Sequence, residues 1–153
     1  MNLFNSFSEG MTSFQKYSAD PELEKLFMER AANPAGDIMG PDLYRSVYGD
    51  PPAKPATVII NRGYHVQRGK VKDMLAMAPE LETLFKKVDV SIGVVMPVIA
   101  ADHEMIGITY RFTSIDHMGS ALDAMVENQD IQKLVTKANE LGNLNMTRVI
   151  NIM

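Results

Sequence analysis

The chain has 153 residues, of which 46% are hydrophobic, and its 15 Lys and Arg against 19 Asp and Glu give a formal net charge of -4. This length suits one globular domain with a sizeable core, or two small units packed together. The acidic balance without a basic block argues against nucleic acid as a partner, and the absence of cysteine excludes disulfides, thiolate nucleophiles and cysteine-based metal sites.

No segment of the sequence predicts a membrane or secreted protein. The most apolar stretch, VSIGVVMPVIAA from Val90, is shorter than the roughly 18 residues that span a bilayer, and it alternates like a strand. The N-terminus MNLFNSFSEG has neither a positive leader nor an unbroken apolar run. We therefore expect a cytoplasmic protein without a membrane partner. The twelve methionines either fill an adaptable core or line a ligand pocket.

The front of the chain predicts helical structure followed by a strand. SFSE, from Ser6 to Glu9, fits a capping box at a helix start, and LYRSVY, from Leu43, suits a strand. GDPPAKPA, from Gly49, is rich in Pro and Gly and predicts a linker. We assign residues 1–49 to a partial unit, 50–56 to the linker and 57–153 to a complete unit.

The complete unit starts with a strand and a helix. TVIINRGYHVQ, from Thr57 to Gln67, is rich in β-branched and aromatic residues and is interrupted by RGK. From Lys70 the apolar residues recur every three or four positions, which predicts an amphipathic helix. Pro79 lies inside this pattern, so we expect a kink or a break into two short helices there.

The rest of the unit predicts a hairpin, a helix and a closing strand. VVMPVIAADHEMIGITYRF contains two alternating segments around a short tip, which is typical of a hairpin. TSIDHMGSALDAMVENQDIQKLVTKANELG predicts a helix with a stutter near Asn128, ended by Gly142. The order strand, helix, strand, strand, helix, strand predicts an α+β, ferredoxin-like βαββαβ unit, with an antiparallel sheet and both helices on one face.

The front third repeats the end of this unit: its helical part aligns without a gap when it is shifted by 108 residues, and LYRSVY corresponds to MTRVIN, from Met146, after a short insertion. We therefore interpret residues 1–49 as the last helix and last strand of a first ferredoxin-like unit. The alternative is an unrelated helical extension. The identical pairs at this shift are Phe4 and Phe112, Ser6 and Ser114, Lys25 and Lys133, and Leu26 and Leu134.

The chain resembles the dimeric α/β-barrel superfamily in three segments. These are YHVQRGK before the first helix, the hairpin, and NQDIQKLVTKANELG before the closing strand. The NIPSNAP-like and antibiotic-biosynthesis-monooxygenase-like branches look similar in these places. The resemblance implies two ferredoxin-like units packed sheet to sheet. A fused member would have a strand, a helix and two strands before Phe4, so either the chain is a piece of a longer one or another chain completes the partial unit. We expect a homodimer.

Strand alternation separates the candidate site residues. If Val66 faces the helices, then Asn61, His65 and Gln67 point to the other sheet face, which in the resembled superfamily looks into the barrel. Asn61 and His65 are candidate catalytic residues, because an imidazole and a carboxamide can accept a proton and stabilise an oxyanion. Related monooxygenases and haem-degrading members use an Asn on this strand together with a Trp or another His, and this chain has no Trp. The alternative is a His65 satisfied at a dimer seam.

Other residues suggest ligand binding more than catalysis. Arg111, Tyr110 and Gln67 are candidate ligand-binding residues, and Arg45 and Arg148 are further arginines that could anchor an acidic ligand. No metal site and no cofactor are predicted. His103 is expected to lie in a solvated hairpin tip, with its flanking carboxylates splayed apart. His117 falls in the first turn of its helix and is expected to be a surface or seam residue.

Two functions remain open at this point, and whether the chain is an enzyme is not decided. The first is a non-catalytic dimer with a structural role or a hydrophobic small molecule as ligand. The second is a cofactor-independent, monooxygenase-like enzyme that acts on a hydrophobic compound in the barrel cavity. The first is favoured, because the further Trp or His expected beside Asn61 and His65 is missing.

Overall fold

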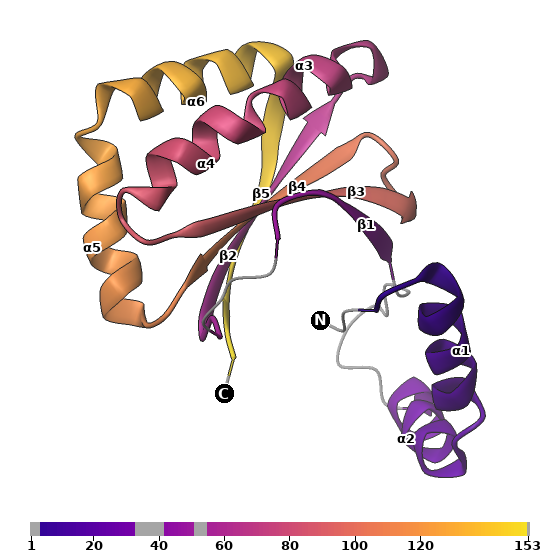
Figure 1. Ribbon diagram of the computed structural model, residues 1–153. Coiled ribbons are helices and arrows are strands. Elements are labelled where there is room, and N and C mark those ends of the chain that lie inside the picture. The colour runs from indigo at the N-terminus through magenta and orange to yellow at the C-terminus, as the bar shows by residue number, and fades with distance from the viewer. Residues whose placement is uncertain (1–3, 33–41, 51–54, 153) are drawn as a thin grey trace. The chain divides into compact units, whose positions relative to one another are not determined.

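The computed structural model describes residues 4–32, 42–50 and 55–152 (Figure 1). It divides into two compact units, residues 1–40 and residues 41–153. The strand predicted from Leu43 is therefore part of the second unit, although the sequence placed a boundary at residue 49. Residues 51–54, most of the predicted linker, lie outside the described residues.

The first unit is a pair of helices, α1 (Phe7–Ser18) and α2 (Pro21–Ala32). Ser6 caps α1 as predicted, because its hydroxyl accepts from the N–H of Glu9 at 3.1 Å. Asp20 starts α2 in the same way, with its Oδ1 accepting from the first N–H groups of that helix. Asp20 thus lies between the two helices, and its carboxylate caps the second one.

The second unit is a five-stranded antiparallel sheet with helices on one side, so the predicted α+β, ferredoxin-like architecture is confirmed. Its strand order is β1-β3-β4-β2-β5, in which β2, β3, β4 and β5 form the predicted βαββαβ sheet and β1 extends it at β3. The elements are β1 (Leu43–Tyr48), β2 (Val58–Val66), η1 (Arg68–Lys70), α3 (Val71–Ala76), α4 (Ala78–Lys86), β3 (Ser91–Ile99), β4 (Met105–Phe112), α5 (Ile115–Val126), α6 (Gln129–Leu141) and β5 (Gly142–Asn151).

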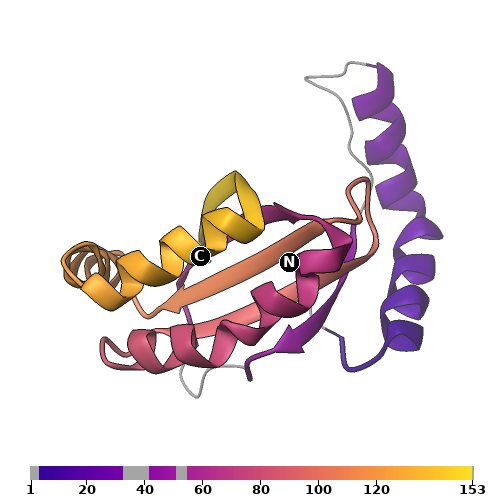
Figure 2. The same cartoon turned by 90° about the horizontal axis from the view of Figure 1, so that it is seen from above.

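The core lies between the sheet and the layer of α3, α4, α5 and α6 (Figure 1 and Figure 2). Every second residue of the central strands points into it, including Ile60, Ile92 and Tyr110, which are cross-strand neighbours. The helices contribute their apolar stripes, as the three-and-four spacing predicts. The largest side chains with less than 2% exposure are Phe112, Ile92, Ile106, Val58, Val66 and Val90.

Both predicted irregularities divide a helix in two. The helix breaks at Met77, between the end of α3 at Ala76 and the start of α4 at Ala78, and Pro79 lies in the first turn of α4, because proline cannot supply an N–H to a continuous helix. Asn128 separates α5 from α6, and its Oδ1 accepts from the N–H groups of Asp130 and Ile131. The stutter is thus a break with a new N-cap.

Gly142 ends α6 as predicted, but it does so in an extended conformation and is also the first residue of β5. An added Cβ there would lie 2.6 Å from the carbonyl oxygen of His65. Glycine at this position therefore allows β5 to approach β2 closely.

The helix pairs α1–α2 and α5–α6 begin and break in the same manner. Ser114 caps α5 by accepting from the N–H three residues on, as Ser6 does for α1. Asn128 caps α6 through Oδ1, as Asp20 does for α2. The members of each pair are 108 residues apart, which is the shift at which the two segments align.

Candidate functional site

The sheet has two different faces, and strand β2 contributes to both. Ile60, Tyr64 and Val66 are buried in the core beneath the helices. Asn61 and His65 therefore lie on the other side, called here the open face, as the alternation predicted. This assignment separates the candidate residues into two groups.

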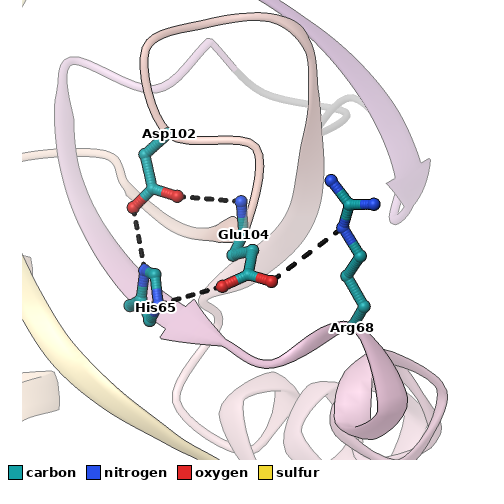
Figure 3. Close-up of polar contacts among 4 residues, drawn as sticks. All are labelled: His65, Arg68, Asp102 and Glu104. Atoms are coloured by element: carbon teal, nitrogen blue, oxygen red, sulfur yellow. Dashed lines mark hydrogen bonds and ion pairs between the residues drawn. The ribbon is translucent and has the colours of Figure 1, made fainter.

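On the open face, His65 is held between two carboxylates (Figure 3). Its Nδ1 lies 3.0 Å from Oδ2 of Asp102, and its Nε2 lies 3.2 Å from Oε2 of Glu104. The two acids come from the tip between β3 and β4. The backbone N–H of Glu104 donates to Oδ1 of Asp102 at 2.8 Å, and Arg68 Nε lies 3.9 Å from the other oxygen of Glu104. We call His65, Asp102 and Glu104 the imidazole clasp.

The clasp favours the charged forms of His65 and Asp102. The hydrogen bond with Asp102 raises the pKa of His65 above its ordinary value, and the charges of Asp102 and Glu104 add to this. The hydrogen bond with His65 in turn lowers the pKa of Asp102. Both ring nitrogens can donate at once only in the imidazolium form. The geometry is therefore that of a protonated histidine between two anions.

This geometry suits neither a general base nor a metal site. An imidazole with both nitrogens engaged has no free lone pair with which to accept a substrate proton. The carboxylates sit at opposite nitrogens rather than around one point, and among the described residues no group of three or more His, Asp and Glu could hold a metal ion. The clasp therefore ties the hairpin tip to β2.

The sequence reasoning missed the acids of the clasp, although it had a signal that could have found them. Met105 pairs with His65 in the β2–β4 register, and the N–H of Val66 donates to the carbonyl of Glu104 at 2.8 Å. The hairpin tip must therefore lie beside His65. The carboxylates do not splay apart as expected. Both turn toward His65, while His103 between them is exposed.

The remaining candidates on the open face do not gather around His65. Arg111 lies over Gly93, and its Nη1 donates to the carbonyl of Ile92 at 3.2 Å. Partial burial lowers the pKa of Arg111. Oδ1 of Asn61 is buried without a hydrogen-bond partner, opposite Arg148 in the β2–β5 register. A buried polar atom without a partner costs free energy, so Asn61 adds no stability through this oxygen.

Much of the open face is closed by its own side chains. An added Cβ at Gly107 would lie 2.6 Å from Val95 Cγ2, and one at Gly63 would lie 2.7 Å from Met105 Sδ. Neighbouring side chains thus lie flat over the glycines of the central strands.

Tyr110 lies on the helix side rather than on the open face. Tyr110 points toward the helices, with its ring centroid 4.8 Å from that of Phe85. Burial raises the pKa of Tyr110 to about 12. Gln67 is exposed at the end of β2. His117 is partly buried: its Nε2 lies 2.8 Å from the carbonyl oxygen of Val88, and its Nδ1 accepts from the N–H of Thr113, so it ties α5 to the turn before β3.

A cavity of about 40 Å³ lies on the helix side, between the sheet and α3, α4 and α6. We call it the helix-side cavity. Its walls are almost entirely apolar, and its polar groups come from Arg62, Tyr64 and Tyr110. Of the residues predicted to bind or react, only Tyr110 lines it. The other lining residues are Met74, Met77, Ala78, Leu81, Val94, Ile106, Ile108, Leu134, Val135 and Ala138.

Comparisons by sequence find no relative: no protein-family model matches the chain, and no curated protein is significantly similar to it. Among the described residues, no helix combines the length and apolar character needed to cross a bilayer.

Solved structures are similar in fold at low identity. A NIPSNAP family protein from Agrobacterium tumefaciens is 18% identical, with a TM-score of 0.50, over 61% of this chain and 90% of that one. A heme-degrading enzyme from Listeria monocytogenes is 10% identical, with a TM-score of 0.52, over 85% and 94%. A monooxygenase-like protein from Listeria innocua is also 10% identical, with a TM-score of 0.52, over 88% and 89%.

Identities this low speak to the fold and not to the reaction. The sheet order, the one-sided helix layer and these likenesses agree: the chain has a ferredoxin-like fold.

Proposed function

We propose that this protein is a non-catalytic homodimer that binds a small apolar molecule in the helix-side cavity. The observation that carries the proposal is the cavity itself. It is lined by Met74 and Met77 among other apolar groups, at a place where well-packed cores leave few voids. Methionine side chains adapt their shape easily, so the cavity can enlarge around a ligand.

Binding is favoured over catalysis because of the state of His65. The monooxygenase-like alternative requires His65 and Asn61 to act together on a substrate. His65 instead has both ring nitrogens bound to carboxylates, and neither His65 nor Asn61 lines the helix-side cavity. The ligand and the imidazole would thus lie on opposite faces of the sheet.

The sheet edges support a second copy as partner. Strands β1 and β5 are the two edges of the sheet, and exposed edges are usually paired or covered. Apolar side chains are exposed on or beside them, including Tyr44, Val149 and Ile152. A second copy would cover these exposed apolar groups.

The same proposal treats α1, α2 and β1 as a second version of α5, α6 and β5. The shared caps at Ser6 and Ser114, and at Asp20 and Asn128, support this internal repeat. Tyr17 and Leu26 are largely exposed, whereas their counterparts Met125 and Leu134 are buried on the sheet. The first pair would thus also need a sheet to cover it.

A neutral, environment-sensitive dye tests ligand binding. We expect the fluorescence of Nile red to rise on addition of the protein, and the Ala138→Leu variant to lose this rise because the larger side chain fills the cavity. Ala124→Leu, an equal change at an exposed position of α5, is the matched control. Equal fluorescence with the wild type and a folded Ala138→Leu variant would contradict the proposed site.

Sedimentation tests the dimer separately. We expect a dimer of the wild type and a shift toward monomer for Ile150→Asp, because Ile150 is partly buried and pairs with Ile59 on the open face. Val126→Asp, at an exposed position of α5, should leave the dimer unchanged. A wild-type monomer at high concentration would count against the dimer.

A further inference from the structure

Arg62 is a charged residue on the apolar side of the sheet. It belongs to the alternate set of β2 that faces the helices, and it lines the helix-side cavity. Its guanidinium carbon lies 5.4 Å from the centroid of the Tyr110 ring, a distance at which a cation and a ring attract each other. The rest of the cavity offers a cation only Tyr64 and Tyr110 as polar neighbours.

The guanidinium of Arg62 lacks a counter-charge within the described chain. Its Nε is buried without a hydrogen-bond partner. None of the ion pairs among the described residues includes Arg62. A buried donor without an acceptor costs free energy, and contact with a ring satisfies the charge without giving Nε an acceptor.

The cavity contains further hydrogen-bond donors beside Nε of Arg62, and together they suit a carboxylate. Burial keeps the Tyr110 hydroxyl protonated, with a pKa of about 12, so it can donate a hydrogen bond at any physiological pH. A guanidinium presents its N–H groups as a planar fork that fits the two oxygens of a carboxylate. The Met, Leu and Val side chains around it suit an uncharged hydrocarbon body.

We propose that the ligand of the helix-side cavity is a small apolar carboxylic acid, whose carboxylate binds Arg62 and whose hydrocarbon part packs among Met74, Met77 and Leu81. This inference rests on the proposed function and adds the chemical class of the ligand. The volume of about 40 Å³ is close to that of one small polar group. It therefore holds the carboxylate, and the hydrocarbon part displaces the flexible methionines.

Calorimetry with hexanoic acid and hexanamide at neutral pH tests the inference. The two probes have the same size and differ in charge. We expect the wild type to bind the acid about 10- to 100-fold more tightly than the amide, as a charged hydrogen bond allows. Arg62→Gln should bring the two affinities together. Lys72→Gln, the same loss of charge at an exposed position of α3, should retain the preference.

Arg62→Lys tests the fork separately from the charge, and we expect an intermediate preference for the acid. Should the Arg62 variants not fold, hexanoic acid labelled with ¹³C at the carboxyl carbon gives an independent result with the wild type. Bound to Arg62, the carboxyl group should stay ionised to a lower pH than in the free acid. A bound carboxyl that titrates at the same or a higher pH would overturn the inference.

The outcomes separate the two proposals. Equal affinities for acid and amide in the wild type, or an acid preference that survives in folded Arg62→Gln, overturn the carboxylate inference and leave the ligand cavity standing. Absence of hexanoic acid binding overturns the carboxylate inference as well, whether or not Nile red binds. Failure of Nile red together with both hexanoyl probes overturns both proposals.

Discussion

The two faces of the sheet are formed by alternate residues of the same strands, yet they are stabilised differently. The helix side has helices over it and buries Phe112, Ile92 and Ile106 almost completely. The open face has side chains lying flat over glycines, such as Arg111 over Gly93, and a charged clasp at one end. On the helix side, the partly exposed Arg62 lines a mostly apolar cavity together with Tyr64 and Tyr110. On the open face, His65 lies between the carboxylates of Asp102 and Glu104.

The difference shows how strand alternation distributes chemistry within one segment. Along β2, Asn61 and His65 point to one side and Arg62 to the other. Polar groups that are neighbours in sequence therefore cannot share a site. A ligand site built on this fold uses one set or the other, and the unpartnered Nε within a cavity favours the set that includes Arg62.

The largest effect is expected from removing a core side chain on the helix side. Phe112→Ala should lower the free energy of unfolding by about 3–5 kcal/mol, because Phe112 is only 1% exposed. Val95→Ala on the open face, where the side chain is partly exposed, should cost about 1 kcal/mol. Urea unfolding of both variants measures the contrast. Equal losses would show that the open face is as fully covered as the core.

Much of the fold follows from local patterns in the sequence. Pro79 and Asn128 divide helices because one lacks an N–H and the other caps a new helix. The alternation of β4 buries Ile106, Ile108 and Tyr110 together. These features depend on neighbours a few residues away, which the sequence displays directly.

The site depends on contacts between distant segments, and the sequence shows these poorly. Asp102 and His65 are 37 residues apart and meet only through strand register. In the sequence Arg62 looks like an ordinary strand residue. Only the packing of α3, α4 and α6 on the sheet shows that it lines a cavity. No local pattern shows that a charge remains without a partner, because that depends on every segment packed around it.

Adding a methyl group on the open face should lower the free energy of unfolding less than Phe112→Ala does. Gly107→Ala would place its Cβ 2.6 Å from Val95 Cγ2, and a β-branched side chain has little freedom to move aside. We expect unfolding free energy to fall by about 1–3 kcal/mol. Gly119→Ala on α5, with no atom within 4 Å of the new Cβ, should instead raise it by about 0.4–1 kcal/mol. A neutral Gly107→Ala would show a loosely closed face.

The smallest effect is expected from the imidazole clasp, because its groups are partly exposed. The raised pKa of His65 stabilises the fold below the ordinary value of 6.5, and this contribution is lost as pH rises through the raised pKa. The lowered pKa of Asp102 stabilises it above the ordinary value of 3.8, and this contribution is lost as pH falls through the lowered pKa. Both contributions are therefore present together between these two ordinary values.

His65→Gln should accordingly lower the urea midpoint most between pH 3.8 and 6.5, and its difference from the wild type should shrink at alkaline pH. His103→Gln removes an exposed imidazole from the same hairpin tip. Because His103 is the smallest of the contributions that lower the pKa of Asp102, the profile of this variant should differ from the wild type far less than that of His65→Gln. A His65→Gln difference that stays constant up to alkaline pH would mean that packing of the ring, rather than its charge, ties the tip to β2.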